Sequence, residues 1–87
     1  AYVHFEVVKE LLKDERVDPT ADNNYTIRLA SNNGHLEVVK ELLKDERVDP
    51  TVNDDYAIRY ASRNGHLEVV KELLKDKRVK SLSNGQR

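Results

Sequence analysis

Hydrophobic residues recur along this chain at helical spacing, and the whole pattern repeats every 31 residues. Within positions 36–43 the apolar residues fall on one broad stripe, and charged residues take the opposite side. The same pattern returns at positions 5–13 and 67–75. We therefore predict three copies of one amphipathic helix, each helped by a first-turn Glu and a last-turn Lys that suit the helix dipole. The apolar residues of the middle copy are Leu36, Val38, Val39, Leu42 and Leu43.

An extended loop is expected after each long helix. Pro50, in the segment Val48-Asp49-Pro50-Thr51, has no backbone N–H and prevents the helix from continuing. It also biases Asp49 toward an extended conformation. The Asp and Asn residues that come next, at positions 22–24 and 53–55, tolerate left-handed turns. We expect them to form such a turn and then to cap the start of another helix.

A second, shorter helix is predicted in each full unit, over positions 25–33 and 56–64. Gly34 and Gly65 follow it directly, at the place where a left-handed residue ends a helix at least cost. Small alanines within these helices would let the paired helices approach closely. Each unit is thus a short helix, a glycine turn, a long helix and a loop. A fixed period of this length is typical of stacked repeats, which bury their apolar faces against one another.

The segment Tyr-x-Ile-Arg-x-Ala-Ser-x-Asn-Gly-His-Leu-Glu-Val-Val-Lys-Glu-Leu-Leu in each full unit resembles the ankyrin repeat. The match is closest at positions 34–43, which are similar to the second helix of that family. Two features depart from it: the family's T-P-L-H stretch aligns with Tyr25-Thr26-Ile27-Arg28, and the period is 31 rather than about 33. The resemblance implies an all-α, ankyrin-type helical repeat solenoid. It also implies a concave target-binding surface made by the loop tips and the exposed face of the first helices.

We expect residues 1–87 to form a single ankyrin-like array of two and a half stacked helix-turn-helix units. The first unit lacks a short helix, and the last uses the same apolar set as the internal units, so both ends should expose apolar surface. The chain is then either a fragment of a longer array or self-associates end to end, and Leu82 is a candidate lid for the last unit. The array divides into a half repeat at 1–19, repeats at 20–50 and 51–80, and a C-terminal tail at 81–87.

Composition excludes several classes of function. With 38% hydrophobic and 36% charged residues, the chain has no apolar run near the ~20 residues of a membrane span. A net charge of −1 gives no general attraction to nucleic acid. The absence of cysteine removes disulfides, thiolate chemistry and Cys-based zinc sites. No signal-peptide pattern is visible at the N-terminus, which favours an intracellular location.

Nothing in the sequence points to catalysis or to a cofactor. His4, His35 and His66 occupy the same position in successive units, but helices packed ~8–10 Å apart would not bring them onto one metal ion. We interpret them as structural residues that satisfy backbone groups at the turn between helices. No phosphate-binding, dinucleotide-binding or nucleophile motif occurs. We therefore expect no enzyme activity, no cofactor and no metal.

Comparison of the two full units singles out one face. Positions 34–47 and 65–78 differ only at Glu46/Lys77. In contrast, half of the positions differ between 20–33 and 51–64. Some differences lie in the loops, and three lie at i, i+3 and i+6 on one side of the short helix. We interpret this variable stripe and the loop tips as solvent-facing and expect them to bind a protein partner. The candidate residues are Asp22, Asn24, Thr26, Leu29, Asn32, Asn53, Asp54, Asp55, Ala57, Tyr60 and Arg63.

Tyr60 is the strongest single anchor among these residues, because aromatic side chains carry a large share of interface energy. Arg63, one turn further on, is suited to a carboxylate of the partner, whereas Asp54 and Asp55 favour a basic patch. The alternative is that Tyr60 only shields the helix pair and that the acids only cap and solubilise. For the whole chain, the alternative is a structural spacer or an engineered consensus scaffold with no natural binding partner.

Overall fold

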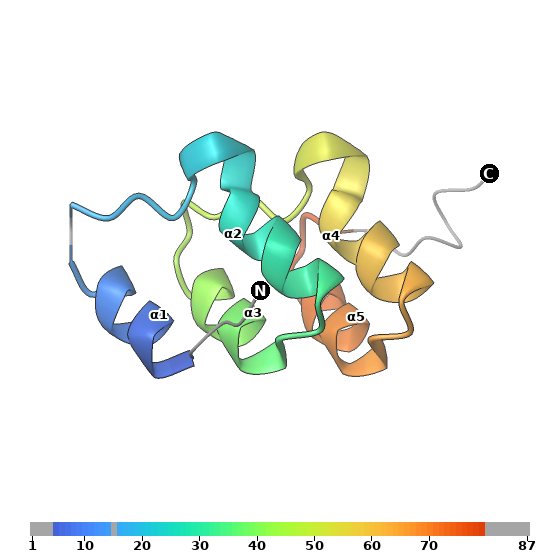
Figure 1. Cartoon of the computed structure of the whole chain (residues 1–87). Coiled ribbons are helices and arrows are strands. Elements are labelled where there is room, and N and C mark those ends of the chain that lie inside the picture. Colours follow the sequence, from blue (N-terminus) through green and yellow to red (C-terminus); the bar gives the residue numbers. More distant parts are fainter. Residues whose placement is uncertain (1–4, 15, 80–87) are drawn as a thin grey trace.

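The protein is built from two layers of α-helices (Figure 1). The computed structural model describes residues 5–14 and 16–79, and this part of the chain contains helices and no strand. Three long-helix copies lie side by side in one layer: α1 (Phe5–Leu12), α3 (Leu36–Leu43) and α5 (Leu67–Leu74). The second layer consists of α2 (Ala21–Asn32) and α4 (Val52–Arg63). These helices have 12 residues each and α1, α3 and α5 have 8 each, so the prediction that the first helix of a unit is the shorter one is wrong. We keep the names long helix and short helix for the two layers. α2 packs on α3 and α4, and α4 packs on α5.

The prediction of three copies of one amphipathic helix is confirmed. Each long helix has a Glu in its first turn. In α3, Val39 and Leu42 are 0% exposed, and Lys44 Nζ pairs with Glu41 Oε1 at 3.3 Å on the polar side. The corresponding pair in α5 measures 3.2 Å. The same residues thus make the same helix in the same surroundings. None of the helices in the described segments has the length and apolarity needed to cross a bilayer.

Each short helix begins with a left-handed turn. The residues at 22–24 and 53–55 have φ between +54° and +60°, and the right-handed helix follows from Tyr25 and Tyr56. Asp and Asn tolerate this conformation better than other residues with a side chain. The predicted turn is therefore confirmed. The predicted cap is wrong at Asn24, because its side-chain oxygen accepts a hydrogen bond from the backbone N–H of Asp49 (2.9 Å) instead.

The glycine turns between paired helices are also as predicted. Gly34 has φ +75° and Gly65 has φ +76°. After each glycine, a backbone N–H returns to the helix it leaves, from His35 to the carbonyl of Ala30 (2.9 Å) and from His66 to that of Ala61 (2.8 Å). These bonds satisfy carbonyls at the helix end, so the chain reverses without losing backbone hydrogen bonds.

The hydrophobic core lies between the two helix layers. Ile27 and Ile58 of the short helices reach 0% and 1% exposure, and the loops contribute Val48 and Val79. The alanines expected to allow close helix approach, Ala30 and Ala61, are both buried. The buried hydrophobic residues form one cluster: Ile27, Ala30, Val38, Val39, Leu42, Val48, Ala57, Ile58, Ala61, Val69, Leu73 and Val79.

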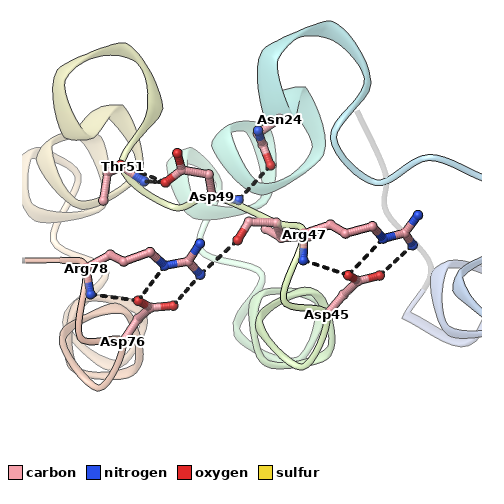
Figure 2. Close-up of polar contacts among 8 residues, drawn as sticks. Asn24, Asp45, Arg47, Asp49, Thr51, Asp76 and Arg78 are labelled. Carbon is pink, nitrogen blue, oxygen red and sulfur yellow. Dashed lines mark hydrogen bonds and ion pairs between the residues drawn. The ribbon is translucent and has the colours of Figure 1, made fainter.

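The loop after each long helix is held by an aspartate that binds an arginine two residues later (Figure 2). Asp45 accepts bonds from the backbone N–H, Nε and Nη2 of Arg47, the last at 2.7 Å. Asp76 and Arg78 repeat this arrangement, and Arg78 Nη2 also donates to the carbonyl of Val48 (2.9 Å) in the preceding loop. These hydrogen bonds from arginine lower the pKa of both carboxyl groups.

The Asp-Pro-Thr segment forms a turn of its own. Asp49 Oδ1 accepts bonds from the backbone N–H (2.9 Å) and the hydroxyl (2.6 Å) of Thr51, which lowers the pKa of Asp49. Asp18 and Thr20 make the same contacts in the first loop. Pro50, between Asp49 and Thr51 in the sequence, is fully buried. The loops before both left-handed turns therefore have the same set of hydrogen bonds.

Both ends of the array expose apolar surface, as predicted. Val7 and Leu11 of α1 are 54% and 50% exposed, and Leu67 and Leu74 of α5 are 62% and 41% exposed. His4 and the proposed lid at Leu82, within the tail at 81–87, lie outside the described residues.

Candidate functional site: the short-helix face

The candidate partner-binding residues differ widely in how much solvent they contact. Most of the loop-tip residues and one end of the variable stripe lie at the surface. The exposed residues are Asp22, Thr26, Asn53, Asp54 and Arg63. The partly buried residues are Leu29, Asn32, Asp55 and Tyr60.

Two of the candidate residues do not lie at the surface, and the expectation of exposure is wrong for them. Asn24 is 7% exposed, because its side chain turns inward to the backbone of Asp49 (Figure 2). Ala57 is 1% exposed and belongs to the core, since α4 packs directly on α2. Its equivalent in α2, Thr26, is exposed because no other described short helix covers that side of α2.

Asn32 connects the two full units. Its Nδ2 donates to the hydroxyl of Tyr56 (2.9 Å), and its Oδ1 and backbone carbonyl both accept from Nδ2 of Asn64 (2.9 Å each). The same carbonyl accepts a bond from Nε2 of His66 (3.0 Å), so that nitrogen carries the proton. The predicted structural role is confirmed for His66. The side chain of Asn32 is therefore used inside the array, whereas Arg63 stands at the same position in the last unit.

Tyr60 lies at the centre of a group of aromatic and cationic side chains on α4. Its ring centroid is 4.3 Å from that of Tyr56. The guanidinium carbons of Arg63 and Arg59 lie 5.0 Å and 5.4 Å from the same centroid. Tyr60 thus packs on its own helix and also remains partly open to solvent.

A second group, which the comparison of units overlooked, surrounds Arg28 of α2. Its guanidinium carbon lies 5.4 Å from the ring centroids of both Tyr25 and Tyr56, so it bridges the two short helices. Arg28 also donates to the backbone carbonyls of Asn23 (3.1 Å) and Asp22 (2.9 Å). The guanidinium therefore holds the carbonyls of the left-handed turn in place.

Arg59 repeats this role in the second unit, where it donates to the carbonyls of Asp54 (2.7 Å) and Asn53 (3.2 Å). The sequence signal was the Tyr-x-Ile-Arg stretch, identical in both units and different from the family pattern. A search for differences between units passes over it. Together these side chains form what we call the tyrosine–arginine face: Tyr25, Arg28, Tyr56, Arg59, Tyr60 and Arg63.

Charge is distributed unevenly between the two layers. The ion pairs within the described segments lie on the long helices and in the loops that follow them. Arg28, Arg59 and Arg63 have no ion pair with a carboxylate in the described part of the chain. The arginines of the tyrosine–arginine face are thus positioned by aromatic rings, and two of them by carbonyls as well.

No group of three or more His, Cys, Asp or Glu side chains in residues 5–14 and 16–79 is placed to hold a metal ion. The geometry instead offers an open, solvent-facing surface with aromatic, cationic and acidic groups.

The fold and this face define the class as a helical-repeat array whose short helices and loop tips share one open side. A family model described as ankyrin repeats (3 copies) matches residues 1–83. The chain belongs to the ankyrin repeat family, whose members are generally noncatalytic protein–protein interaction modules. No curated protein and no solved structure gives a significant match to the chain.

Proposed function

We propose that this chain is a noncatalytic module that binds a protein partner through its loop tips and its tyrosine–arginine face. The observation that carries the proposal is that, within the described part of the chain, the arginines of this face contact tyrosine rings instead of carboxylates. Arg28, Arg59 and Arg63 lie over tyrosine rings and have no carboxylate partner in the described residues. Tyr and Arg are enriched at the centres of protein interfaces, where preorganised side chains lose least on binding.

The charges on this side suggest the chemistry of the partner. Arg63 is exposed and suits an acidic side chain, because a guanidinium binds a carboxylate through two parallel hydrogen bonds. Asp22 and Asp54 are exposed at the loop tips and suit a basic group. The partner segment would then carry its negative charge toward the end of α4 and its positive charge toward the left-handed turns.

The chain supplies its own variants for a test. Tyr60→Leu and Arg63→Asn install the residues that the preceding unit carries at Leu29 and Asn32, so both should fold. Lys77→Glu installs the residue at Glu46 and serves as the matched control away from the short helices. Proteins captured from an extract should bind the control like the unmodified chain. Binding should weaken about 30-fold in each of the other two, for a loss of about 2 kcal/mol at an interface hot spot.

The same experiment separates the proposal from its alternative. Capture of the same proteins by all variants would place the interface elsewhere on the surface. The absence of any specifically bound protein would favour a structural spacer or a consensus scaffold, a reading to which the near-identity of positions 34–47 and 65–78 also points. Circular dichroism and thermal melting of each variant would show that the fold is retained.

A further inference from the structure

Large exposed hydrophobic side chains gather at the two ends of the array. Apart from Tyr25, which belongs to the tyrosine–arginine face, they are Val7 and Leu11 of α1 and Leu67 and Leu74 of α5 in the described residues. At least 41% of each of these four side chains is exposed. We call the first pair the α1 end face and the second pair the α5 end face. Between the two end faces, Tyr25 is the only large hydrophobic side chain that is exposed among the described residues.

The chain itself shows what covers these positions when a neighbour is present. α3 has a long helix on either side, and its four equivalent residues are covered. Val38 and Leu42 are 2% and 0% exposed, and Leu36 and Leu43 are partly buried against the core. The two end faces therefore correspond to the two sides of α3.

Sequence identity makes this correspondence close. α3 and α5 have the same sequence, LEVVKELL, and α1 differs only at its first residue. The α5 end face thus presents to solvent the surface that α3 presents to α5. The α1 end face presents the surface that α3 presents to α1 and α2. An interface made by these two faces would repeat one that the chain already makes within itself.

A hollow beside the α5 end face fits the same reading. It is lined by Ser62, Gly65, His66, Leu67 and Val70. At the internal boundary, the ring of His66 occupies the space beside Gly34 and comes so close that a Cβ there would lie 2.6 Å away. Beside Gly65 nothing lies within 4 Å of the same point. The last unit thus has an open space beside Gly65, and the equivalent space beside Gly34 is filled by the His66 ring of the neighbouring unit.

We propose that a second copy of this chain docks head to tail, with the α1 end face of one copy on the α5 end face of the other. The contact is heterologous, so it can repeat and build short open chains of copies. It is also incomplete, because α1 has no short helix of its own in the described residues to cover α4. An interface that lacks one of its helices is small, and small interfaces are weak and form only as concentration rises.

The test uses two charge substitutions on opposite end faces of the full chain. Leu11→Glu blocks the α1 end face, and Leu74→Glu blocks the α5 end face. Leu11 is 50% exposed and Leu74 is 41% exposed, so the fold should tolerate both changes. Lys40→Gln on the central helix, an exposed position, changes the net charge by the same amount and is the control.

Sedimentation velocity over a wide concentration range should give a mass that rises beyond the dimer for the unmodified chain and for Lys40→Gln. Leu11→Glu and Leu74→Glu should each remain monomeric, with association at least about tenfold weaker. Mixed together, the two variants should form a one-to-one dimer and nothing larger, since one intact face of each kind remains. A monomeric unmodified chain would overturn the proposal. So would a mixture that stays monomeric, or Leu11→Glu dimerising alone, which would mean that two α5 end faces meet.

Discussion

The imidazole ring of His66 lies against the backbone of Gly34. A Cβ on Gly34 would come within 2.6 Å of Nδ1 of that ring, and Nε2 donates a hydrogen bond to the carbonyl of Asn32 (3.0 Å). The second full unit thus inserts a side chain into a space that only glycine leaves open. The contact joins the glycine turn of one unit to that of the next.

Replacing Gly34 by alanine should destabilise the protein more than the same change at Gly65. Both glycines have a positive φ, near +75°, and an alanine in the left-handed region costs about 1–2 kcal/mol at either site. Only Gly34 faces the His66 ring, so Gly34→Ala should lose about 1–3 kcal/mol more through overpacking. Urea unfolding followed by circular dichroism measures both changes. Equal losses would show that the ring moves aside without cost.

Arg28 should contribute more to stability than Arg59. Both hold the carbonyls of a left-handed turn, but only Arg28 lies between tyrosines of two different short helices. Arg28→Ala should therefore lower the free energy of unfolding by about 0.5–1 kcal/mol more than Arg59→Ala, the size of one further cation–π contact. Arg28→Lys keeps the charge but loses the fork of donors, so it should recover only part of the loss. Similar values for both alanine variants would contradict a bridging role.

The helices and glycine turns were predictable because they depend on spacing along the chain. An apolar stripe at 36–43 and a glycine at 34 act locally, and the repeat shows the same local pattern again. The exposed ends were predictable for a related reason. Once units are known to stack, the first and last of them have one neighbour fewer, whatever their detailed contacts.

The candidate site was harder to predict, since burial there depends on the neighbouring unit. Ala57 was grouped with Thr26 because the two positions are equivalent, yet α2 covers one and not the other. Asn24 was taken for an exposed turn residue, but its partner is a backbone group 25 residues away. Arg28 was passed over because it does not vary between units, although it lies between the rings that shape the face.

Substitutions at Asn24 should lower the stability of the fold. Three variants separate the effect of its side-chain acceptor from that of its left-handed backbone conformation. Asn24→Asp keeps an acceptor for the N–H of Asp49 and tolerates φ +59°, so it should be the most stable of the three variants, with some loss because it buries a carboxylate. Asn24→Gly keeps only the backbone freedom and should lose about 1–3 kcal/mol, because a buried donor is left unsatisfied. Asn24→Ala adds backbone strain and should be the least stable. Chemical denaturation ranks the three variants, and a neutral Asn24→Gly would show that water replaces the side chain.

Acid should weaken the loops through Asp76. The hydrogen bonds from Arg78 lower the pKa of this carboxyl group below its ordinary value in the folded protein. The folded state thus binds a proton less readily than the unfolded chain. The stabilising effect is complete above the unfolded pKa of about 3.9 and is lost as the pH falls through the lower, folded value.

The free energy of unfolding, measured by urea titration between neutral and acidic pH, should therefore fall below about pH 4. Asp76→Asn should be less stable at neutral pH, since it loses the charge-assisted bonds to Arg78, and should lose less stability on acidification. Arg78→Ala removes the donor instead of the acceptor and should flatten the acid dependence in the same way. The remaining dependence in both variants would come from the other aspartates whose pKa values are lowered by hydrogen-bond donors, which are Asp14, Asp18, Asp45 and Asp49. If Asp76→Asn kept the full acid dependence of the unmodified chain, the loop formed by Asp76 and Arg78 would not be where acid acts.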